Sequence, residues 1–353
     1  MRYRLLIAAI VMLALTSATG WTADKPARGL EIYFIDTEGG AATLLVTPTG
    51  ESVLIDCGNP GARDADRIYR TSKEAGLKAI DHLVITHWHL DHYGSVARLS
   101  QLMPIHHFYD HGIPAKLEED PKNFPLLIQA YKKASQGKSK TLKAGDEVTL
   151  KQVEGGPPLR MLCLCGSGDV VPDKPGAPEN PVVREHVPQA PDPTDNARSL
   201  GFLIGYGEFR FLDLGDLTWN IEYKLVHPTD KIGLVDVYQS THHGLDISNN
   251  PVVLKTVQPR VAVFNNGPRK GGHATVIATL RRLPEAPAIY QMHRNLLASA
   301  QENTDAEFIA NTEEKNCSGE GIKLSVSPDS KTYTVAVGSK GKSRHFDTRG
   351  PAQ

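Results

Sequence analysis

The sequence predicts an α/β fold in which layers of strands lie inside and helices lie outside. Strand-like runs alternate with helical patterns through both halves of the chain. Polar signatures follow several of these runs, where loops on a rigid scaffold can carry function. The composition, with 40% hydrophobic and 22% charged residues, suits a globular core.

The first 23 residues have the features of a secretory signal peptide. Two arginines precede an unbroken apolar run over 5–15, and small residues follow it. The run is shorter than the ~20 residues that span a bilayer, and no later segment is apolar enough to do so. We expect residues 1–23 to be removed, residues 24–353 to form one domain, and the mature protein to be periplasmic or secreted. An uncleaved N-terminal anchor is the alternative.

The overall charge does not indicate a nucleic-acid partner. Formal net charge is −1, and loss of Arg2 and Arg4 would make it −3. Without a basic excess the field of the whole molecule does not recruit nucleic acid, although a local groove could still bind it.

The cysteine content does not indicate a disulfide framework. Four cysteines follow the signal region, at Cys57, Cys163, Cys165 and Cys317. Two interpretations remain open: one bridge from Cys317 to Cys163 or Cys165, or four small buried thiols.

The first half predicts three strands joined by Gly and Pro turns, which form an antiparallel meander, followed by alternating helices and strands. The expected strands cover 30–36, 43–47, 52–56, 80–85 and 105–109, and the expected helices cover 62–75 and the residues from Tyr93 onward. Residues 111–145 are expected to be a polar insertion with a helix over 124–135.

The second half predicts a hairpin and further alternating elements. The hairpin joins 200–204 to 208–212, further strands cover 235–239, 261–265, 288–291, 322–327 and 332–337, and helices follow Leu217 and cover 274–283. The Pro-rich stretch 166–196 is expected to form a flap near the functional site.

The stretch Thr86–His92 concentrates side chains that bind metals. His87, His89, Asp91 and His92 follow a buried strand run, and imidazole and carboxylate are common zinc ligands. His87 and His89 alternate along an extended chain, so they can face the same way. The pattern predicts two metal ions side by side, and a solvated polar loop is the alternative.

Other polar clusters follow later strand runs. Asp216 ends one run, His242 and His243 end another, and Asp195 and Asn196 precede a third. A further carboxylate, Asp56, ends the strand beside the motif strand, where we expect it to hold the motif loop through hydrogen bonds.

These motifs resemble those of the metallo-β-lactamase fold superfamily, and they are most similar to the hydrolase domain of competence-type DNA-uptake proteins. The resemblance covers roughly residues 30–300 and rests on the short motifs. It implies a four-layer αβ/βα sandwich, with mixed sheets inside, helices outside and one or two zinc ions at one edge of the sheets.

The resemblance also implies the ligands of the second metal. Asp91 and His92 would bind it, His243 would complete it, and Asp216 would bridge both ions. His242 would then contact substrate or support a ligand, although the order of these two histidines is left open.

The first metal would be bound by His87 and His89, and here the sequence departs from the superfamily. Asn196 lies where a third histidine is usual, and an amide oxygen is a weaker zinc ligand than imidazole. Manganese is therefore an alternative ion for this site. A second departure, at residues 36–42, makes DNA an unsafe inference as the substrate.

The expected function is that of an exported metal-dependent hydrolase that uses a metal-bound hydroxide. Asp91 would also orient the water, and His273 or His242 would protonate the leaving group. Asp216 favours a small-molecule or phosphodiester substrate, or a related ester, because the β-lactamases proper generally lack a bridging carboxylate there. β-Lactam hydrolysis and a non-catalytic metal- or ligand-binding module are the alternatives.

Overall fold

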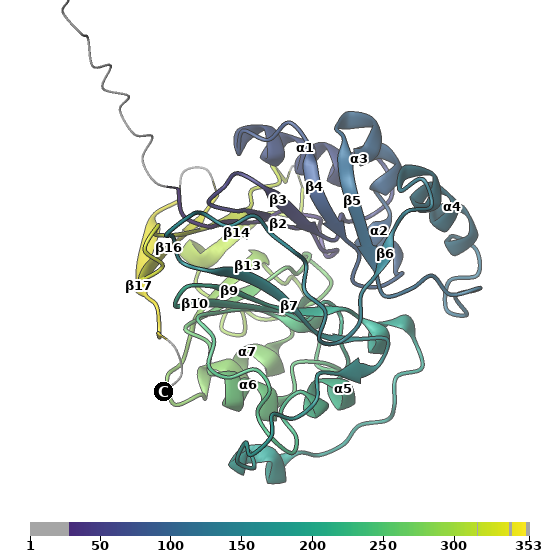
Figure 1. The fold of residues 1–353 in the computed structure, drawn as a ribbon. Coiled ribbons are helices and arrows are strands. Elements are labelled where there is room, and N and C mark those ends of the chain that lie inside the picture. The colour runs from purple at the N-terminus through teal and green to yellow at the C-terminus, as the bar shows by residue number, and fades with distance from the viewer. Residues whose placement is uncertain (1–27, 316, 339–340, 351–353) are drawn as a thin grey trace, which may run out of the picture.

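The computed structural model describes residues 28–315, 317–338 and 341–350, so the expected signal peptide lies outside the described residues. Two mixed sheets face each other, and helices cover the outer face of each (Figure 1). This arrangement confirms the predicted sandwich with helices outside. No helix in the described ranges is long and apolar enough to cross a membrane.

The first sheet combines strands from the start and the end of the chain. Its order is β17-β16-β15-β1-β2-β3-β4-β5-β6. The bounds are β1 Glu31–Phe34, β2 Thr43–Val46, β3 Ser52–Ile55, β4 Ile80–Val84, β5 Ile105–Asp110, β6 Lys140–Thr141, β15 Ile322–Val326, β16 Thr332–Val337 and β17 Ser343–Asp347. Strands β1 to β3 form the predicted antiparallel meander, whereas β3, β4 and β5 pair in parallel.

The second sheet comes from the second half of the chain. Its order is β14-β13-β12-β11-β10-β9-β7-β8. The bounds are β7 Leu159–Gly166, β8 Asp169–Val170, β9 Gly201–Tyr206, β10 Phe209–Asp213, β11 Val237–Gln239, β12 Val261–Phe264, β13 Ala288–His293 and β14 Ile309–Asn311. Strands β9 and β10 form the predicted hairpin, and β10 to β14 pair in parallel.

Helices on the two outer faces come from the two halves separately. The first sheet carries α1 Ala62–Glu74, α2 Leu90–Tyr93, α3 Val96–Leu102 and α4 Phe124–Ala134, and the second carries α5 Trp219–Lys224, α6 Pro251–Val257 and α7 Ala274–Arg281 (Figure 1). Short 3₁₀ turns are η1 Pro181–Glu185, η2 Asp195–Arg198, η3 Thr241–Gly244 and η4 Ala306–Phe308.

The expected helix from Tyr93 is wrong in its start. A short turn, α2, already begins at Leu90 and includes Asp91 and His92, and α3 begins at Val96. Gly94 lies between α2 and α3 and packs against Pro60. A side chain does not fit there, because a Cβ on Gly94 would lie 2.4 Å from the proline ring. The break lets the motif turn inward before the helix starts.

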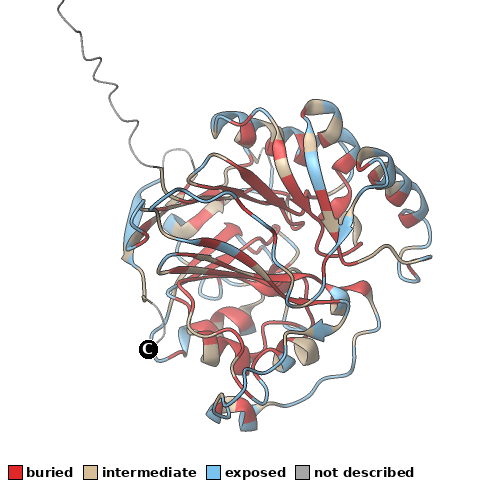
Figure 2. Ribbon diagram, in the orientation of Figure 1, coloured by how far each residue is buried: buried red, intermediate tan, exposed pale blue. Residues whose placement is uncertain are grey.

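Three hydrophobic clusters hold the layers together. One fills the space between the sheets, where Phe34 and Phe211 meet edge-to-face with ring centroids 5.7 Å apart. The other two lie between each sheet and its helices. Figure 2 shows the central strands of both sheets and the inner sides of the helices buried, whereas β5 and β17 carry exposed residues. Burial of this apolar surface is the main force that holds the sandwich together.

The parallel pairs determine where the polar clusters meet. Strands β3 and β4 run in parallel in one sheet, as do β10 and β11 in the other. Residues that follow these four strands therefore gather at one edge of the sandwich. A buried hydrogen bond from Thr43 Oγ1 to Gln239 Oε1, of 2.7 Å, joins the two sheets.

Candidate metal centre

Asp216, just after β10, is the point on which the buried histidines converge. Its Oδ2 atom lies 3.2 Å from Nε2 of His92, 3.2 Å from Nε2 of His243, 3.4 Å from Nε2 of His242 and 4.0 Å from Nε2 of His87. The four rings come from both halves of the chain. A single carboxylate surrounded by imidazoles has the donor chemistry of a zinc ligand.

Asp91 supplies a second carboxylate to the same cluster. Its Oδ2 lies 3.4 Å from Nε2 of His243 and 3.7 Å from Nε2 of His92. Two groups of ligand-type side chains therefore share His92: His87, His92 and Asp216, and Asp91, His92 and His243. Nε2 of His92 can bind only one ion, so two adjacent ions would divide the remaining imidazoles and carboxylates between them.

Several donor atoms of the cluster have no hydrogen-bond partner. Among the described residues, Nε2 of His87, His92 and His243 and Oδ1 of Asp216 are buried without one, despite the short distances to Oδ2. Buried polar atoms are normally satisfied, so orphans in one cluster indicate an ion that binds there. The residues present thus fit one or two divalent metals.

The charges of the cluster also fit a cation. Burial keeps the pKa of His87 well below its usual value, and burial lowers the pKa of His242 to about 4. Burial alone would raise the pKa of Asp216, but the surrounding imidazoles keep it well below its usual range. Burial alone would lower the pKa of His92, but Asp216, Asp56 and Asp91 raise it well above its usual value. Neutral imidazoles and ionised carboxylates are the forms that bind metal, so His92 would release a proton when an ion binds.

Asp56 positions the motif loop, as the sequence predicted. Its Oδ1 accepts a hydrogen bond from the Thr86 amide (2.8 Å), and its Oδ2 lies 2.7 Å from both Thr86 Oγ1 and His92 Nδ1. The carboxylate thereby fixes the ring of His92 with Nε2 facing Asp216. Asp56 has a φ of +59°, which places backbone strain at the strand end.

The two histidines after β11 also have a strained backbone. His242 and His243 have φ values of 54° and 55° in η3, a left-handed conformation that is uncommon outside glycine. Gly271 crowds the same turn, since a Cβ there would lie 2.1 Å from the carbonyl oxygen of His243. Such strain concentrates at functional sites, and here it turns both rings toward Asp216.

His89 is placed differently from the other motif residues. Its ring lies beside that of His87, with centroids 4.7 Å apart, but its Nε2 faces Oε1 of Glu119 at 3.3 Å. Glu119 comes from the 111–145 segment, and its Oε1 also accepts a hydrogen bond from the Asp195 amide. No local pattern in the sequence predicts the contact between His89 and Glu119, because the two residues lie 30 positions apart in the chain.

The segment that carries Asn196 packs directly against the motif loop. Oδ2 of Asp195 accepts hydrogen bonds of 2.8 Å from the Trp88 amide and 2.9 Å from His111 Nε2, and the Leu200 amide donates to the Thr86 carbonyl. Asn196 Oδ1 is buried and has no hydrogen-bond partner among the described residues. A role as a metal ligand stays a prediction.

The predicted proton donor His273 does not join the cluster around Asp216. Its half-exposed ring faces Thr275 Oγ1 at 2.9 Å and Asp246 Oδ2 at 3.6 Å. Lys270, which the sequence did not indicate, instead reaches the site: its Nζ contacts Asp91 Oδ2. Of the two predicted histidines, His242 lies nearer the cluster, with its Nε2 3.4 Å from Asp216 Oδ2.

All four cysteines are free, so the possible bridge from Cys317 is absent. Cys57, Cys163 and Cys165 are buried thiols as expected, whereas Cys317 is only partly buried.

Residues 36–162 match the family model of the metallo-β-lactamase superfamily. Over this stretch the chain is similar to the metallo-β-lactamase superfamily. The matched stretch includes β4 and the His87–His92 motif, and the two facing sheets show the α/β fold of this superfamily. No curated protein matches the chain.

Three solved structures have a fold similar to that of this chain at low sequence identity. A protein of Parabacteroides distasonis proposed to be a metal-dependent hydrolase is 17% identical and has a TM-score of 0.42, with 74% of this chain and 92% of that chain covered. The metallo-β-lactamase fold protein YhfI of Bacillus subtilis is 12% identical, with a TM-score of 0.45 and coverage of 74% and 96%. CmlA, a diiron β-hydroxylase of Streptomyces venezuelae, is 15% identical, with a TM-score of 0.39 and coverage of 67% and 44%.

The geometry distinguishes the two histidines whose order the sequence left open. Nε2 of His243 lies near both carboxylates, whereas His242 lies near Asp216 alone and its Nδ1 faces Ser248 Oγ at 3.3 Å.

We therefore expect His243→Ala to lose one metal ion per chain. His242→Ala should keep the metal and lower kcat by about 10²-fold, as loss of an acid–base group does. Elemental analysis beside kinetics checks this, and equal metal loss in both variants would contradict it.

Proposed function

We propose that this chain is a metal-dependent hydrolase that cleaves a phosphodiester or a related ester. One observation carries the proposal: two carboxylates and four buried imidazoles meet at one edge of the sandwich, and among the described residues Nε2 of His87, His92 and His243 and Oδ1 of Asp216 have no hydrogen-bond partner. When bound there, a divalent metal lowers the pKa of water toward neutrality and neutralises charge that develops on substrate.

The residues around the ions would have distinct tasks. Asp216, with Oδ2 facing the imidazoles and Oδ1 unpartnered, has an oxygen for each of two ions. A bridging carboxylate suits the two-metal chemistry of phosphodiester cleavage, in which both the attacking and the leaving oxygen are neutralised. His242, neutral near pH 7 because its pKa is about 4, would form a hydrogen bond to the leaving group from its place beside Asp216.

Lys270 would assist an anionic substrate. Its Nζ contacts Asp91, yet its side chain is 42% exposed. If Asp91 bound a metal, the ammonium of Lys270 would be available to pair with a negatively charged group beside Asp91. This favours a phosphate-containing substrate over a neutral ester.

Export and partners are part of the proposal. The N-terminal 23 residues support a periplasmic or secreted protein, and N-terminal sequencing of the mature chain tests this, since an intact Met1 would contradict it.

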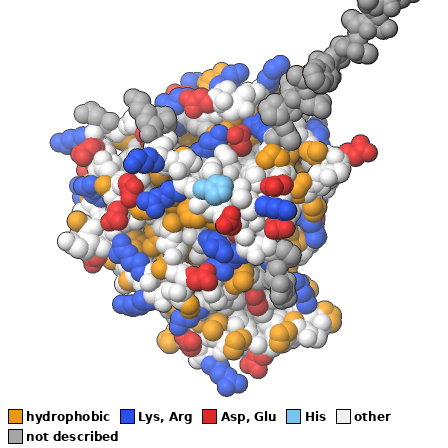
Figure 3. All heavy atoms as spheres, turned by 90° about the vertical axis from the view of Figure 1, so that its left-hand side faces the viewer, with side chains coloured by type: hydrophobic (Ala, Val, Ile, Leu, Met, Phe, Trp, Pro, Cys, Tyr) orange, Lys and Arg blue, Asp and Glu red, His pale blue; other side chains and the backbone are white. Residues whose placement is uncertain are grey.

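The charge does not indicate nucleic acid: Figure 3 shows acidic and basic side chains intermingled on the face that carries β17. A small-molecule phosphodiester therefore remains the preferred substrate class.

A substrate panel tests the proposal. Purified protein loaded with zinc or with manganese should hydrolyse bis-p-nitrophenyl phosphate faster than p-nitrophenyl acetate, nitrocefin or single-stranded DNA. His87→Ala should lose this activity, whereas His106→Ala should keep it, because His106 is exposed on β5 and lies outside both ligand groups. Turnover of nitrocefin alone would identify a β-lactam hydrolase, and a metal-loaded chain that turns over nothing would identify a non-catalytic binding module.

A further inference from the structure

A second group of ligand-type residues lies outside the candidate metal centre. Asp36 follows β1, His293 ends β13, and Cys317 follows β14, so the group joins strands of both sheets. One ligand atom from each residue lies within 4.8 Å of the other two. Asp36 Oδ1 is 2.7 Å from His293 Nε2, and Cys317 Sγ is 3.4 Å from Asp36 Oδ2.

A fourth donor completes the group. Oδ1 of Asn311 lies 3.3 Å from Cys317 Sγ, and Asn311 is the register partner of His293 on the neighbouring strand. Tetrahedral zinc places a sulfur and an oxygen ligand ~3.6 Å apart. The two sulfur–oxygen distances are therefore already close to that geometry, while the Asp36–His293 pair would open to ~3.4 Å.

We propose that Cys317, His293 and Asp36 bind a structural zinc ion, with the side-chain oxygen of Asn311 as the fourth ligand. Thiolate and imidazole together select zinc over harder cations. A zinc site with four protein ligands is closed and structural. The proposal is independent of the hydrolytic function.

The charges around the group can accommodate the ion. Arg67 pairs with Asp36 Oδ2 at 3.0 Å and with Glu38 Oε1 at 3.0 Å, so two carboxylates, one thiolate and one guanidinium surround a divalent cation and leave no net charge. Burial and the nearby Asp36 raise the pKa of the Cys317 thiol. Zinc would displace that proton from Sγ and would leave Arg67 as the hydrogen-bond partner that orients the Asp36 carboxylate.

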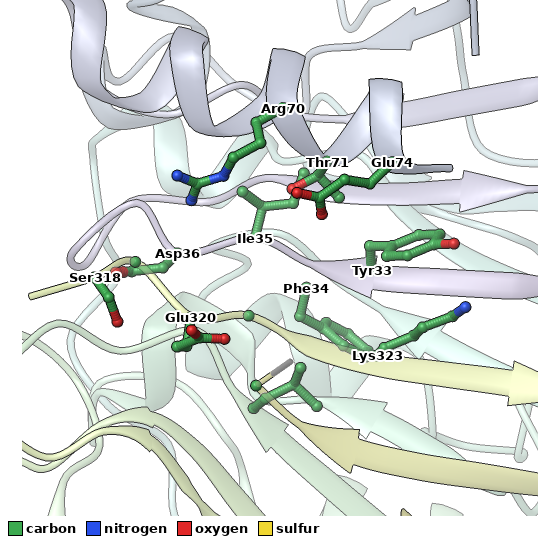
Figure 4. A pocket seen from close by; sticks show the side chains of 14 residues that line it. Tyr33, Phe34, Ile35, Asp36, Arg70, Thr71, Glu74, Ser318, Glu320 and Lys323 are labelled. Carbon is green, nitrogen blue, oxygen red and sulfur yellow. The ribbon is translucent and has the colours of Figure 1, made fainter. Parts of the chain in front are cut away.

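An access route lies beside the group. Asp36, Ser318 and Glu320 line one end of a cavity of about 310 Å³ between β1, α1 and the segment before β15. Figure 4 shows Asp36 and Ser318 next to each other there, below Arg70. A metal can thus reach a group whose histidine is buried between the sheets.

The ion would stabilise the loop that connects Asp36 to the backbone of Asp91. The loop that starts at Asp36 continues to Ala41, whose amide donates a hydrogen bond of 3.1 Å to the Asp91 carbonyl. Gly40 makes this approach feasible, because a Cβ there would lie 2.5 Å from the same carbonyl oxygen. A zinc that fixes Asp36 would therefore also fix the backbone of a ligand in the main centre.

Cobalt substitution tests the proposal. Among the described residues, no cysteine belongs to the two groups around Asp216, so a near-ultraviolet sulfur-to-cobalt charge-transfer absorption reports only on a thiolate site. Fully cobalt-loaded wild-type protein should show this absorption. Cys317→Ala should lose it together with one metal ion per chain, and Asp216→Ala should keep it, which separates this site from the hydrolytic centre.

Cys163→Ala is the matched control, because Cys163 is buried in β7 and belongs to none of the ligand groups. It should keep the absorption. Wild-type protein that fills its other sites with cobalt but shows no such absorption would overturn the proposal, and so would an absorption that Cys317→Ala retains. The wild-type measurement decides even if a variant fails to fold.

Discussion

Replacing Asp216 with alanine should abolish metal binding at the main centre and lower kcat/KM by about 10³-fold or more. Four imidazole nitrogens lie within 4.0 Å of its Oδ2, so removal of the carboxylate takes away the shared ligand and the negative charge of the cluster. Elemental analysis and steady-state kinetics on the same preparations measure both effects.

Two further variants control this result. Asp216→Asn keeps the shape and one oxygen but loses the charge, so it should bind metal more weakly than wild type without disturbing the fold. Asp66→Ala removes a carboxylate that pairs only with Arg98 at the surface, and it should behave as wild type. Normal metal content in Asp216→Ala would show that the cluster is not the metal centre.

Replacing Asp56 with asparagine should weaken metal binding by about 10–100-fold while the protein stays folded. Asparagine tolerates the positive φ of this position and can still accept the hydrogen bond from the Thr86 amide. Its NH₂ group cannot accept the proton of His92 Nδ1, so the ring loses the partner that fixes its orientation. Titration with a competing chelator measures the change.

Asp56→Ala should cost much more stability. It leaves the Thr86 amide and His92 Nδ1 buried without their partner, and it puts a Cβ-bearing residue with no polar side chain at φ +59°. We expect a loss of about 3–5 kcal/mol in the free energy of unfolding. Chemical denaturation of metal-free protein checks this, and equal stability of the two variants would contradict the positioning role.

Local patterns were sufficient to predict the frame of the fold. The meander of β1 to β3 and the β9–β10 hairpin follow from short apolar runs with Gly and Pro turns between them, and the structure confirms both. Helix α6 was missed although its start carries a signal, since Asn250 caps the Val252 amide ahead of a proline at the first helical position. Strand β17 is exposed and polar along its length, so no hydrophobic alternation could reveal it.

The site was predictable only as far as its motifs. Side chains that follow strands can be read from the sequence, and the structure brings five of them, His87, Asp91, His92, Asp216 and His243, into two ligand groups. The contact between Glu119 and His89 joins residues 30 positions apart, and the group around Cys317 joins residues up to 281 positions apart. Such encounters depend on tertiary packing, which no local pattern encodes.

Anomalous diffraction at the zinc absorption edge, on crystals grown with zinc, tests the central claim most directly. The two ligand groups that share His92 predict two peaks ~3.5–4 Å apart on either side of Asp216. A single peak bound by His87, His92 and Asp216 would reduce the centre to one ion. Zinc at full occupancy elsewhere, with no peak beside Asp216, would contradict the assignment of this cluster as the metal centre.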